Sequence, residues 1–269
     1  MKRLVSIALY DPDGRVAPFV RRTIEELATP GTTLVATATH PLQPEDAAWV
    51  RARGDLVERE NVGLDMVGHR LALDAHPPAG FDEVVITNDT FALLQPLARI
   101  EDRVDPSADF WGITGSRERA PHVQSFFVCF RSPIPATAVF AEHWRRVAPA
   151  GRKQTIVANE IGLTRTLVQA GFRFDVAYHP TVADGVRAQL RSLRHPLAGP
   201  WGVVGCWNPY MALADAALDA RLPVIKMSAL RFDPYRLGAD RLLAELERRH
   251  PERMAGVRDY LRRTARAYA

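Results

Sequence analysis

Short apolar runs alternate with helical segments over the first 90 residues, and this alternation constrains the fold more than any other feature of the chain. The expected strands cover residues 4–10, 32–38, 56–59 and 84–86, and the expected helices cover residues 16–27, 44–53 and 66–73. Strands and helices in this order are typical of a parallel sheet with helices on both faces. The pattern therefore predicts an α/β fold.

The strand around Val84-Val85-Ile86 is the one on which the functional interpretation rests. It is β-branched and apolar, as in a buried strand, and it stops at Asn88-Asp89-Thr90. Ligands of open α/β sheets bind beyond the carboxyl ends of the strands, so Asp89 lies where a carboxylate can hold a divalent cation against a phosphate. The alternative is that Asn88 or Asp89 caps a helix that begins at Phe91.

The composition is that of an ordinary globular protein, with 269 residues, 47% hydrophobic and 25% charged. No apolar run approaches the roughly 20 residues that span a bilayer. The first residues fit a strand and a turn better than a signal peptide. The two cysteines, Cys129 and Cys206, have no metal or redox spacing, so we expect a reduced, cytoplasmic protein.

The net charge of +4 is too small to indicate a nucleic-acid partner. It is concentrated in residues 231–269, which contain ten arginines against six acidic residues. A basic helical tail of this kind either contacts acidic lipid at the inner membrane surface or is simply a solvated face. The sequence leaves both interpretations open.

The alternation becomes less regular after Asp89. We expect strands over residues 109–114, 123–130 and 172–178, and helices over 96–104, 136–147 and from Asn159-Glu160 to Val168. Residues 181–207 are rich in turn residues and arginine, which predicts a loop. From Asn208 onward we expect helices, interrupted around residues 222–226 and 233–235.

Four polar segments follow strands or open a helix at one end of the expected sheet. They contain Asp11, the stretch Arg59-Glu60-Asn61-Val62-Gly63-Leu64-Asp65, Asn88-Asp89-Thr90, and Asn159-Glu160. A nucleotide-diphosphate site needs base and ribose contacts, a cation and nearby positive charge, and these residues can provide parts of it. No Walker phosphate loop is present, and no Gly-X-Gly-X-X-Gly follows the first strand, which argues against P-loop enzymes and nicotinamide dehydrogenases.

Several motifs along the chain also match, in the same order, those of one known family. They are residues 59–65, 82–90, 109–114, 122–128, 160–164, 208–209, 223–226 and 233–235. The most specific combines Trp111-Gly112 with His122-Val123-Gln124-Ser125-Phe126-Phe127. In these motifs the sequence resembles the rhamnan synthesis protein F family. The resemblance implies a bacterial glycosyltransferase-like protein of cell-surface polysaccharide synthesis with a GT-A-type nucleotide-sugar fold.

The resemblance assigns roles to two segments. Asn88-Asp89-Thr90 takes the place of the Asp-X-Asp motif, so Asp89 would bind Mg²⁺ or Mn²⁺, although Asn88 and Thr90 replace carboxylates and weaken the expected affinity. Glu160 takes the place of the catalytic aspartate of inverting members and would deprotonate the acceptor hydroxyl. The alternative for Glu160 is a first-turn glutamate stabilised by the helix dipole.

The other candidate residues each have a structural alternative. His122 and Gln124 contact acceptor or sugar hydroxyls, or form structural hydrogen bonds. Trp111 stacks on a sugar face or packs in the core. His179 meets a metal or diphosphate or is an ordinary loop histidine, and Lys226 pairs with phosphate or forms a salt bridge.

The prediction is a GT-A-like, Rossmann-type mixed sheet flanked by helices. Residues 1–205 form the nucleotide-sugar-binding and catalytic domain, and residues 206–269 form a helical C-terminal extension. The expected substrate contacts are Asp11, Arg59, Asn61, Asp65, Asn88, Trp111, His122 and Gln124, with Asp89 and His179 at the metal and Glu160 as the base.

The expected reaction is an inverting transfer from a nucleoside-diphosphate sugar, rhamnose by the family name alone, to a glycan or lipid-linked acceptor. A sugar nucleotidyltransferase is a weaker alternative. Such enzymes usually carry a glycine-rich loop with Lys or Arg after the first strand, and Asp11-Pro12-Asp13-Gly14-Arg15 is a poor substitute for it. A non-catalytic nucleotide-sugar-binding or scaffold protein is the alternative that the incomplete Asp-X-Asp motif favours.

Overall fold

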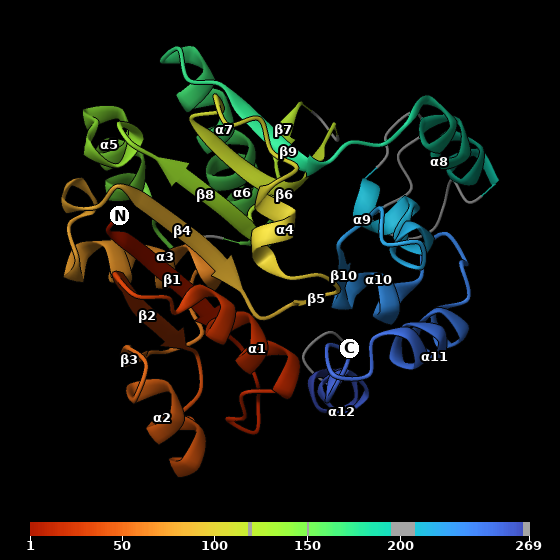
Figure 1. The fold of residues 1–269 in the computed structure, drawn as a ribbon. Helices are drawn as coiled ribbons and strands as arrows, with labels where there is room; N and C mark the ends of the chain where they lie inside the picture. The colour runs from red at the N-terminus through yellow and green to blue at the C-terminus, as the bar shows by residue number, and fades with distance from the viewer. Residues whose placement is uncertain (118–119, 150, 195–207, 266–269) are drawn as a thin grey trace.

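The computed structural model describes residues 1–117, 120–149, 151–194 and 208–265, and its centre is an eight-stranded sheet (Figure 1). The strands are β1 (Arg3–Leu9), β2 (Thr32–Ala38), β3 (Asp55–Glu58), β4 (Glu83–Asn88), β6 (Phe110–Ser116), β7 (His122–Val123), β8 (Phe127–Arg131) and β9 (Phe174–Tyr178). Their order is β3-β2-β1-β4-β8-β6-β7, with β9 beside β6. The strands β1 to β4 are parallel, whereas β8 runs antiparallel to both of its neighbours. The predicted mixed sheet is therefore confirmed.

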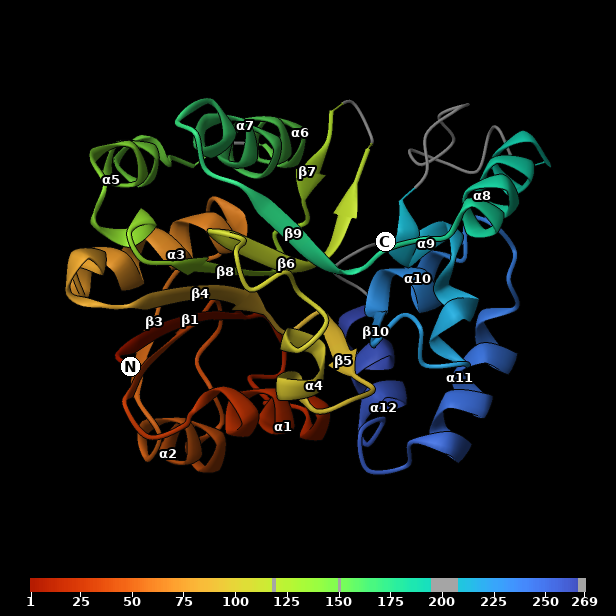
Figure 2. The ribbon, with the colours of Figure 1, turned by 45° about the horizontal axis from the view of Figure 1, so that its top comes forward.

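Helices cover both faces of the sheet, as Figure 2 shows. On one face lie α1 (Pro18–Leu27), α2 (Pro44–Arg51) and α4 (Leu97–Glu101), and on the other lie α3 (Leu64–Ala75), α5 (Ala138–Arg146) and α7 (Gly162–Gln169). Strand β1 explains this arrangement, because successive side chains of a strand point to opposite faces. Val5 and Ile7 join the first layer, and Leu4 joins the second.

The C-terminal region packs at one end of the sheet (Figures 1 and 2). Its elements are α8 (Val182–Arg194), α9 (Pro209–Ala212), β10 (Val224–Lys226), α10 (Met227–Phe232), α11 (Ala239–Arg249) and α12 (Val257–Arg263), with a short 3₁₀ turn at η5 (Ala214–Ala217). Two further 3₁₀ turns, η1 (Pro78–Gly80) and η2 (Ile134–Ala136), lie outside this region, before β4 and after β8. It shares a core with α1, where the rings of Phe19 and Tyr260 meet edge to face at 5.3 Å. The expected boundary at residue 205 lies outside the described residues.

The segment after Asp89 is not the helix that the capping alternative for Asn88 or Asp89 requires. Residues Phe91–Leu93 form the short strand β5, which pairs antiparallel with β10. The interpretation of Asn88 or Asp89 as the cap of a helix is therefore wrong. The backbone groups of this buried segment find their partners in β10 of the C-terminal region rather than within a helix.

Three further expectations need correction. The expected strand over residues 123–130 is divided, because Gln124, Ser125 and Phe126 separate β7 from β8. Residues 182–194 of the expected loop form the helix α8. The helix expected to open at Asn159-Glu160 begins earlier, with α6 (Arg152–Thr155), and continues through the π-helical segment η3 (Ile156–Ile161) into α7. Glu160 is therefore not in a first helical turn.

Candidate functional site

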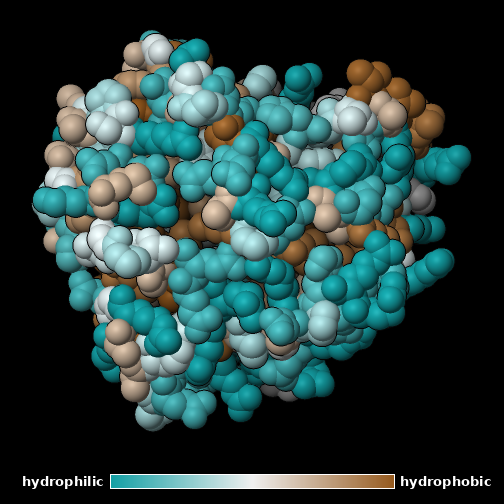
Figure 3. Space-filling view, in the orientation of Figure 1, coloured by the Kyte–Doolittle hydropathy of each residue, from teal (hydrophilic) through white to brown (hydrophobic). Residues whose placement is uncertain are grey.

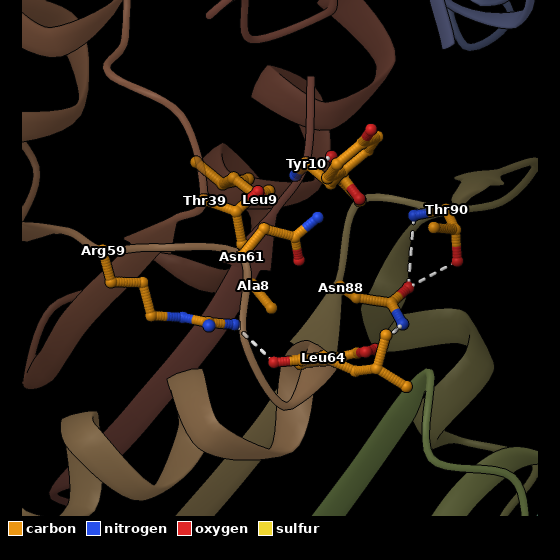
Figure 4. A pocket seen from close by; sticks show the side chains of 11 residues that line it. Ala8, Leu9, Tyr10, Thr39, Arg59, Asn61, Leu64, Asn88 and Thr90 are labelled. Carbon is orange, nitrogen blue, oxygen red and sulfur yellow. Dashed lines mark hydrogen bonds between the residues drawn. The ribbon is translucent and has the colours of Figure 1, made fainter. Parts of the chain in front are cut away.

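A polar pocket lies at the carboxyl ends of β1 to β4, where open α/β sheets bind ligands (Figure 4). It is lined by Ala8, Leu9, Tyr10, Thr39, Arg59, Asn61, Leu64, Asp65, Asn88, Asp89 and Thr90. Five of the residues expected to bind substrate or metal thus come together here, although they belong to two separate segments of the sequence. They are Arg59, Asn61, Asp65, Asn88 and Asp89.

The loop between β3 and α3 is held by the guanidinium group of Arg59. Its Nη1 donates to the carbonyls of Glu60 and Val62, each at 2.9 Å, and its Nη2 donates to the carbonyl of Leu64 (Figure 4). Leu64 has a positive φ of 56°, a conformation that an L-residue adopts only when its surroundings enforce it. Arg59 therefore shapes the pocket wall.

The end of β4 is connected to the first turn of α3. The amide Nδ2 of Asn88 donates to Asp65 Oδ2 at 2.7 Å, and Asn88 Oδ1 accepts from both the backbone N–H and the hydroxyl of Thr90. Both amide atoms of Asn88 are therefore used within the pocket wall. This network fixes the carboxylate of Asp65 toward the pocket.

Asp89 is almost completely buried, and its Oδ2 accepts the backbone N–H of Tyr10 at 2.7 Å. Burial raises the pKa of Asp89 to about 8, the hydrogen bond from Tyr10 opposes this, and the carboxylates of Asp65 and Asp11 add to it. A group with positive charge near this pocket would favour the ionised form.

Behind the pocket, Asp65 is followed one helical turn later by His69, which is fully buried. Ser6 Oγ and His69 Nδ1 are 2.8 Å apart. Burial lowers the pKa of His69 to about 4, the negative charge of Asp65 opposes this shift, and Arg59 adds to it. The imidazole is therefore neutral at physiological pH. Sequence reasoning missed His69, although its spacing of four from Asp65 on an expected helix was visible.

Asp11 lies outside this pocket. Arg263 in α12 donates to Asp11 Oδ2 from Nε at 3.2 Å and from Nη2 at 2.7 Å, and the other oxygen of Asp11 accepts the backbone N–H of Asp13. The carboxylate is thus engaged by the C-terminal region. The expected donor contact of Asp11 is replaced by an ion pair.

Glu160 lies in the π-helical segment η3, and such segments are frequent at functional sites. Its Oε1 accepts the backbone N–H of Ser125 at 3.3 Å and lies 3.6 Å from His122 Nε2. Phe126, which follows Ser125 in the chain, accepts hydrogen bonds through its carbonyl from Asn88 N and Thr87 Oγ1. Residues 124–126 therefore connect Glu160 to the end of β4 beside the pocket.

A second pocket lies on the side of the sheet occupied by β6, β7 and β9. It is lined by Gly115, Ser116, Arg117, Pro121, His122, Phe174, Asp175, Val176, Tyr178, His179, Pro180 and Pro209. His179 Nε2 is 2.9 Å from Asp175 Oδ1. His179 and Asp89, the two expected metal ligands, thus line different pockets.

Trp111 and Gln124 both lie in the interior. Trp111 is 1% exposed and packs against the ring of Phe127, so neither face of the indole is open to a sugar. Gln124 Oε1 accepts the hydroxyl of Thr114 at 2.6 Å. In each case the structure agrees with the structural alternative.

Sequence reasoning missed two residues that line the first pocket. Tyr10 and Thr39 follow β1 and β2, so their position directly after expected strands was a usable signal. Lys226 Nζ donates to Thr90 Oγ1 at 2.5 Å. Lys226 was expected to pair with phosphate or to form a salt bridge, but no local pattern indicated that β10 pairs with β5 and places this lysine beside the first pocket.

The residues of the first pocket fit a divalent cation poorly. Mg²⁺ and Mn²⁺ sites use carboxylates and phosphate oxygens. Here Asn88-Asp89-Thr90 supplies one carboxylate, one oxygen of which already accepts from Tyr10. The ammonium group of Lys226 is bound to Thr90, so a second cation would meet repulsion there. In the described part of the chain, no group of three or more His, Cys, Asp or Glu residues is arranged to hold a metal ion.

Comparison with known proteins assigns the family. The model of the family described as rhamnan synthesis protein F matches residues 42–254. The chain belongs to this family. The resemblance noted in the sequence is thereby confirmed.

One relative of this family member is the uncharacterized protein y4gN of Sinorhizobium fredii (strain NBRC 101917 / NGR234). The two are 25% identical over 188 residues, which cover 65% of this chain and 48% of the relative. The matching part of the chain thus spans about half the length of that protein.

Three solved structures show some likeness to this chain. A putative nucleotide-diphospho-sugar transferase from Desulfovibrio desulfuricans G20 is 13% identical, with a TM-score of 0.38 and coverage of 82% of this chain and 97% of that one. The bifunctional WbbM structure gives 10% identity, a TM-score of 0.41 and coverage of 94% and 52%. Residues 1–349 of TarS from S. aureus, in complex with UDP, are 11% identical, with a TM-score of 0.39 and coverage of 100% of this chain and 92% of that one.

Proposed function

We propose that this rhamnan synthesis protein F family member transfers a sugar from a nucleoside-diphosphate donor to a glycan or lipid-linked acceptor. The observation that supports this most directly is the pocket at the ends of β1 to β4. The side-chain oxygens of Asn61 and Asp65 can accept hydrogen bonds from the hydroxyl groups of a ribose or the N–H groups of a base. Asn88-Asp89-Thr90 forms the side of the pocket toward β10. Glu160 lies beyond this side, next to the residues that contact β4.

The proposed reaction is a single displacement with Glu160 as the base. The acceptor oxygen attacks the anomeric carbon while its proton passes to the Glu160 carboxylate. The bond between the anomeric carbon and the diphosphate oxygen breaks, and the diphosphate leaves with the electron pair. The anomeric centre is thereby inverted. Ser125 N–H orients the Glu160 carboxylate, and His122 lies on its far side, toward the second pocket.

The second pocket is the proposed acceptor side. It contains His122 of the Glu160 pair, and β9 leads from it directly into α8. Four aliphatic side chains of α8 form one exposed stripe, with exposed fractions of 88% for Val182, 56% for Val186, 52% for Leu190 and 55% for Leu193. Figure 3 shows this stripe as an apolar patch on the surface.

We propose that the α8 stripe rests on an anionic phospholipid surface. Arg187 and Arg194 are exposed and lie beside the stripe on the helix, which is the pattern of interfacial helices. Arg187 reaches Asp184 and Asp215 only at 3.9 and 3.8 Å. The C-terminal tail is less suited to this role. Six of its arginines are already in ion pairs with carboxylates, namely Arg248, Arg249, Arg253, Arg258, Arg262 and Arg263. The proposed lipid contact therefore moves from the tail to α8.

The function is tested by calorimetric titration of the full chain with dTDP, UDP and GDP, followed by a transfer or hydrolysis assay with the matching nucleotide sugar. We expect one nucleotide to bind and its sugar nucleotide to be turned over. Binding without turnover in the presence of acceptor glycans would favour the non-catalytic alternative. Absence of binding to a folded sample would contradict the proposed donor site.

A further inference from the structure

The β5–β10 pair places a buried lysine beside the donor pocket, against Thr90 of its lining. Lys226 at the end of β10 is opposite Phe91, and the residue is 7% exposed. The backbone N–H of Met227 donates to the carbonyl of Thr90, and Lys226 Nζ donates to the Thr90 hydroxyl at 2.5 Å. Two consecutive residues of the C-terminal region thus hold Thr90 from both its main chain and its side chain.

The position of the ammonium group is fixed by aromatic rings. Lys226 Nζ lies 4.4 Å from the centre of the Phe126 ring and 5.7 Å from that of Tyr210. Cation–π contacts of this kind stabilise a charged lysine where water is excluded. The field of this charge reaches Asp65. Burial raises the pKa of Asp65, whereas the hydrogen bond from Asn88 and the charge of Lys226 act to lower it.

The residue type is also informative. The chain has 35 basic residues, of which only Lys2, Lys153 and Lys226 are lysines. A surface charge in such a chain would usually be an arginine. Lysine is a compact point charge that binds phosphate without requiring a planar, bidentate partner.

The side-chain types of Asn88, Asp89 and Thr90 agree with this role of Lys226. Where an Asp-X-Asp motif would present two carboxylates to a cation, this chain has an amide and a hydroxyl, and the hydroxyl is bound by a lysine. Negative charge has been removed and positive charge added at the same place. A positive charge of the kind that a divalent cation would supply therefore already lies at the edge of the pocket, bound to Thr90.

We propose that the ammonium group of Lys226 is a built-in cation that receives the diphosphate of the donor, so that nucleotide binding needs no divalent metal. This inference rests on the proposed donor site. During transfer, the same ammonium group stabilises the negative charge that develops on the departing diphosphate. Lys226 would shift its hydrogen bond from Thr90 toward a phosphate oxygen without leaving the pocket.

The first experiment is titration of the full chain with dTDP, UDP and GDP in EDTA and in Mn²⁺. We expect the nucleotide that binds to do so in EDTA, with less than about a threefold gain in affinity from Mn²⁺. Binding that appears only with Mn²⁺ would overturn the inference and leave the donor site intact. Binding in neither condition would remove the proposed function and the inference together.

The second experiment compares Lys226→Met with Lys226→Arg, using Lys2→Met at an exposed position as the control. We expect Lys226→Met to lose at least tenfold in affinity for the nucleoside diphosphate, Lys226→Arg to lose less, and Lys2→Met to be unchanged. Mn²⁺ should not restore binding to Lys226→Met.

Binding of the matching nucleoside, followed by saturation-transfer NMR, separates a phosphate contact from a structural role. The nucleoside has no phosphate, so its affinity should be the same for Lys226→Met and for the unaltered chain. Equal loss of nucleoside and nucleotide would show that the substitution only disrupts the pocket, and unchanged nucleotide affinity would show that Lys226 does not contact the phosphates. Either result overturns the inference.

Discussion

Arg263 in the last described helix donates two hydrogen bonds to one oxygen of Asp11. Asp11 comes two residues after the end of β1, next to Tyr10 of the donor pocket. Arg263 and Asp11 are 252 positions apart, and their side chains are only 10% and 2% exposed. The pair therefore ties the C-terminal region to the edge of the donor pocket.

Arg263→Met should lower the free energy of unfolding by about 3–5 kcal/mol, because it leaves a buried carboxylate without its partner. Chemical denaturation followed by circular dichroism measures this. The exposed neighbour Arg262, changed to Met, is the control and should have little effect. The double variant Asp11→Asn/Arg263→Met should recover part of the loss. Equal destabilisation by Arg263→Met and Arg262→Met would contradict the role of the buried pair.

Arg59→Met should release the loop between β3 and α3. The three carbonyls that Arg59 binds would lose their donors, so we expect a loss of about 2–4 kcal/mol in stability and at least a tenfold loss of nucleotide affinity. Arg51→Met, an exposed substitution at the end of α2, serves as the control. If the affinity of Arg59→Met stayed unchanged, the loop would not form the nucleotide-binding wall.

Glu160→Gln should separate binding from chemistry. Glutamine keeps the acceptor for Ser125 N–H but cannot take the proton of the acceptor hydroxyl, so the transfer rate should fall by roughly 10² to 10⁴. Nucleotide affinity, measured by calorimetry, should remain within about twofold. A variant that transfers sugar at the normal rate would exclude Glu160 as the base.

His69 should make the protein acid-sensitive. Its pKa is about 4 in the folded protein, against 6.5 as its ordinary value. As the pH falls below 6.5, His69 becomes protonated in the unfolded chain but stays neutral in the folded chain. The contribution of His69 to the free energy of unfolding therefore declines until about pH 4. Relative to His69→Gln, the unaltered chain should lose up to about 3 kcal/mol over this window.

The measurement for His69 is denaturant unfolding of both proteins at several pH values between 4 and 7. The difference between the two curves isolates His69 from other titrating groups, including Asp89, whose raised pKa changes stability in the opposite direction. Parallel curves across this range would contradict the burial of a neutral imidazole.

The α8 stripe should bind vesicles that contain phosphatidylglycerol and not vesicles of phosphatidylcholine alone. Leu190→Glu places a negative charge in the stripe and should abolish co-sedimentation. Val168→Glu, at an exposed valine of α7, is the matched control and should sediment like the unaltered chain. Equal binding by both variants, or a concentration-dependent dimer that Leu190→Glu disrupts, would exclude lipid as the partner of this surface.

Much of the sheet could be predicted because its strands carry local signals. The runs in β1, β2 and β4 are apolar and buried, and they are separated by amphipathic helices, so both their order and the edge at which their loops meet follow from the pattern. This is why Asn61, Asp65 and Asp89 were expected together and were found in one pocket.

The remaining features depend on contacts between distant segments. Strands β5 and β10 have three residues each, too few for a periodic signal, and each is stabilised by the other. The use of Asp11 depends on Arg263, and the aliphatic stripe of α8 was hidden by the glycine and arginine residues around it. The π-helical segment has no sequence signature that distinguishes it from an α-helix.

The pairing of β5 with β10 also determines how this protein can be divided in the laboratory. An expression fragment that stops at residue 205 would contain Asn88, Asp89 and Thr90 but leave β5 as an uncovered edge and lack Lys226. Such a fragment would be prone to aggregate through that edge, and its failure to bind nucleotide would say nothing about the complete site. Screening libraries and domain swaps should therefore keep residues 3–265 as one unit.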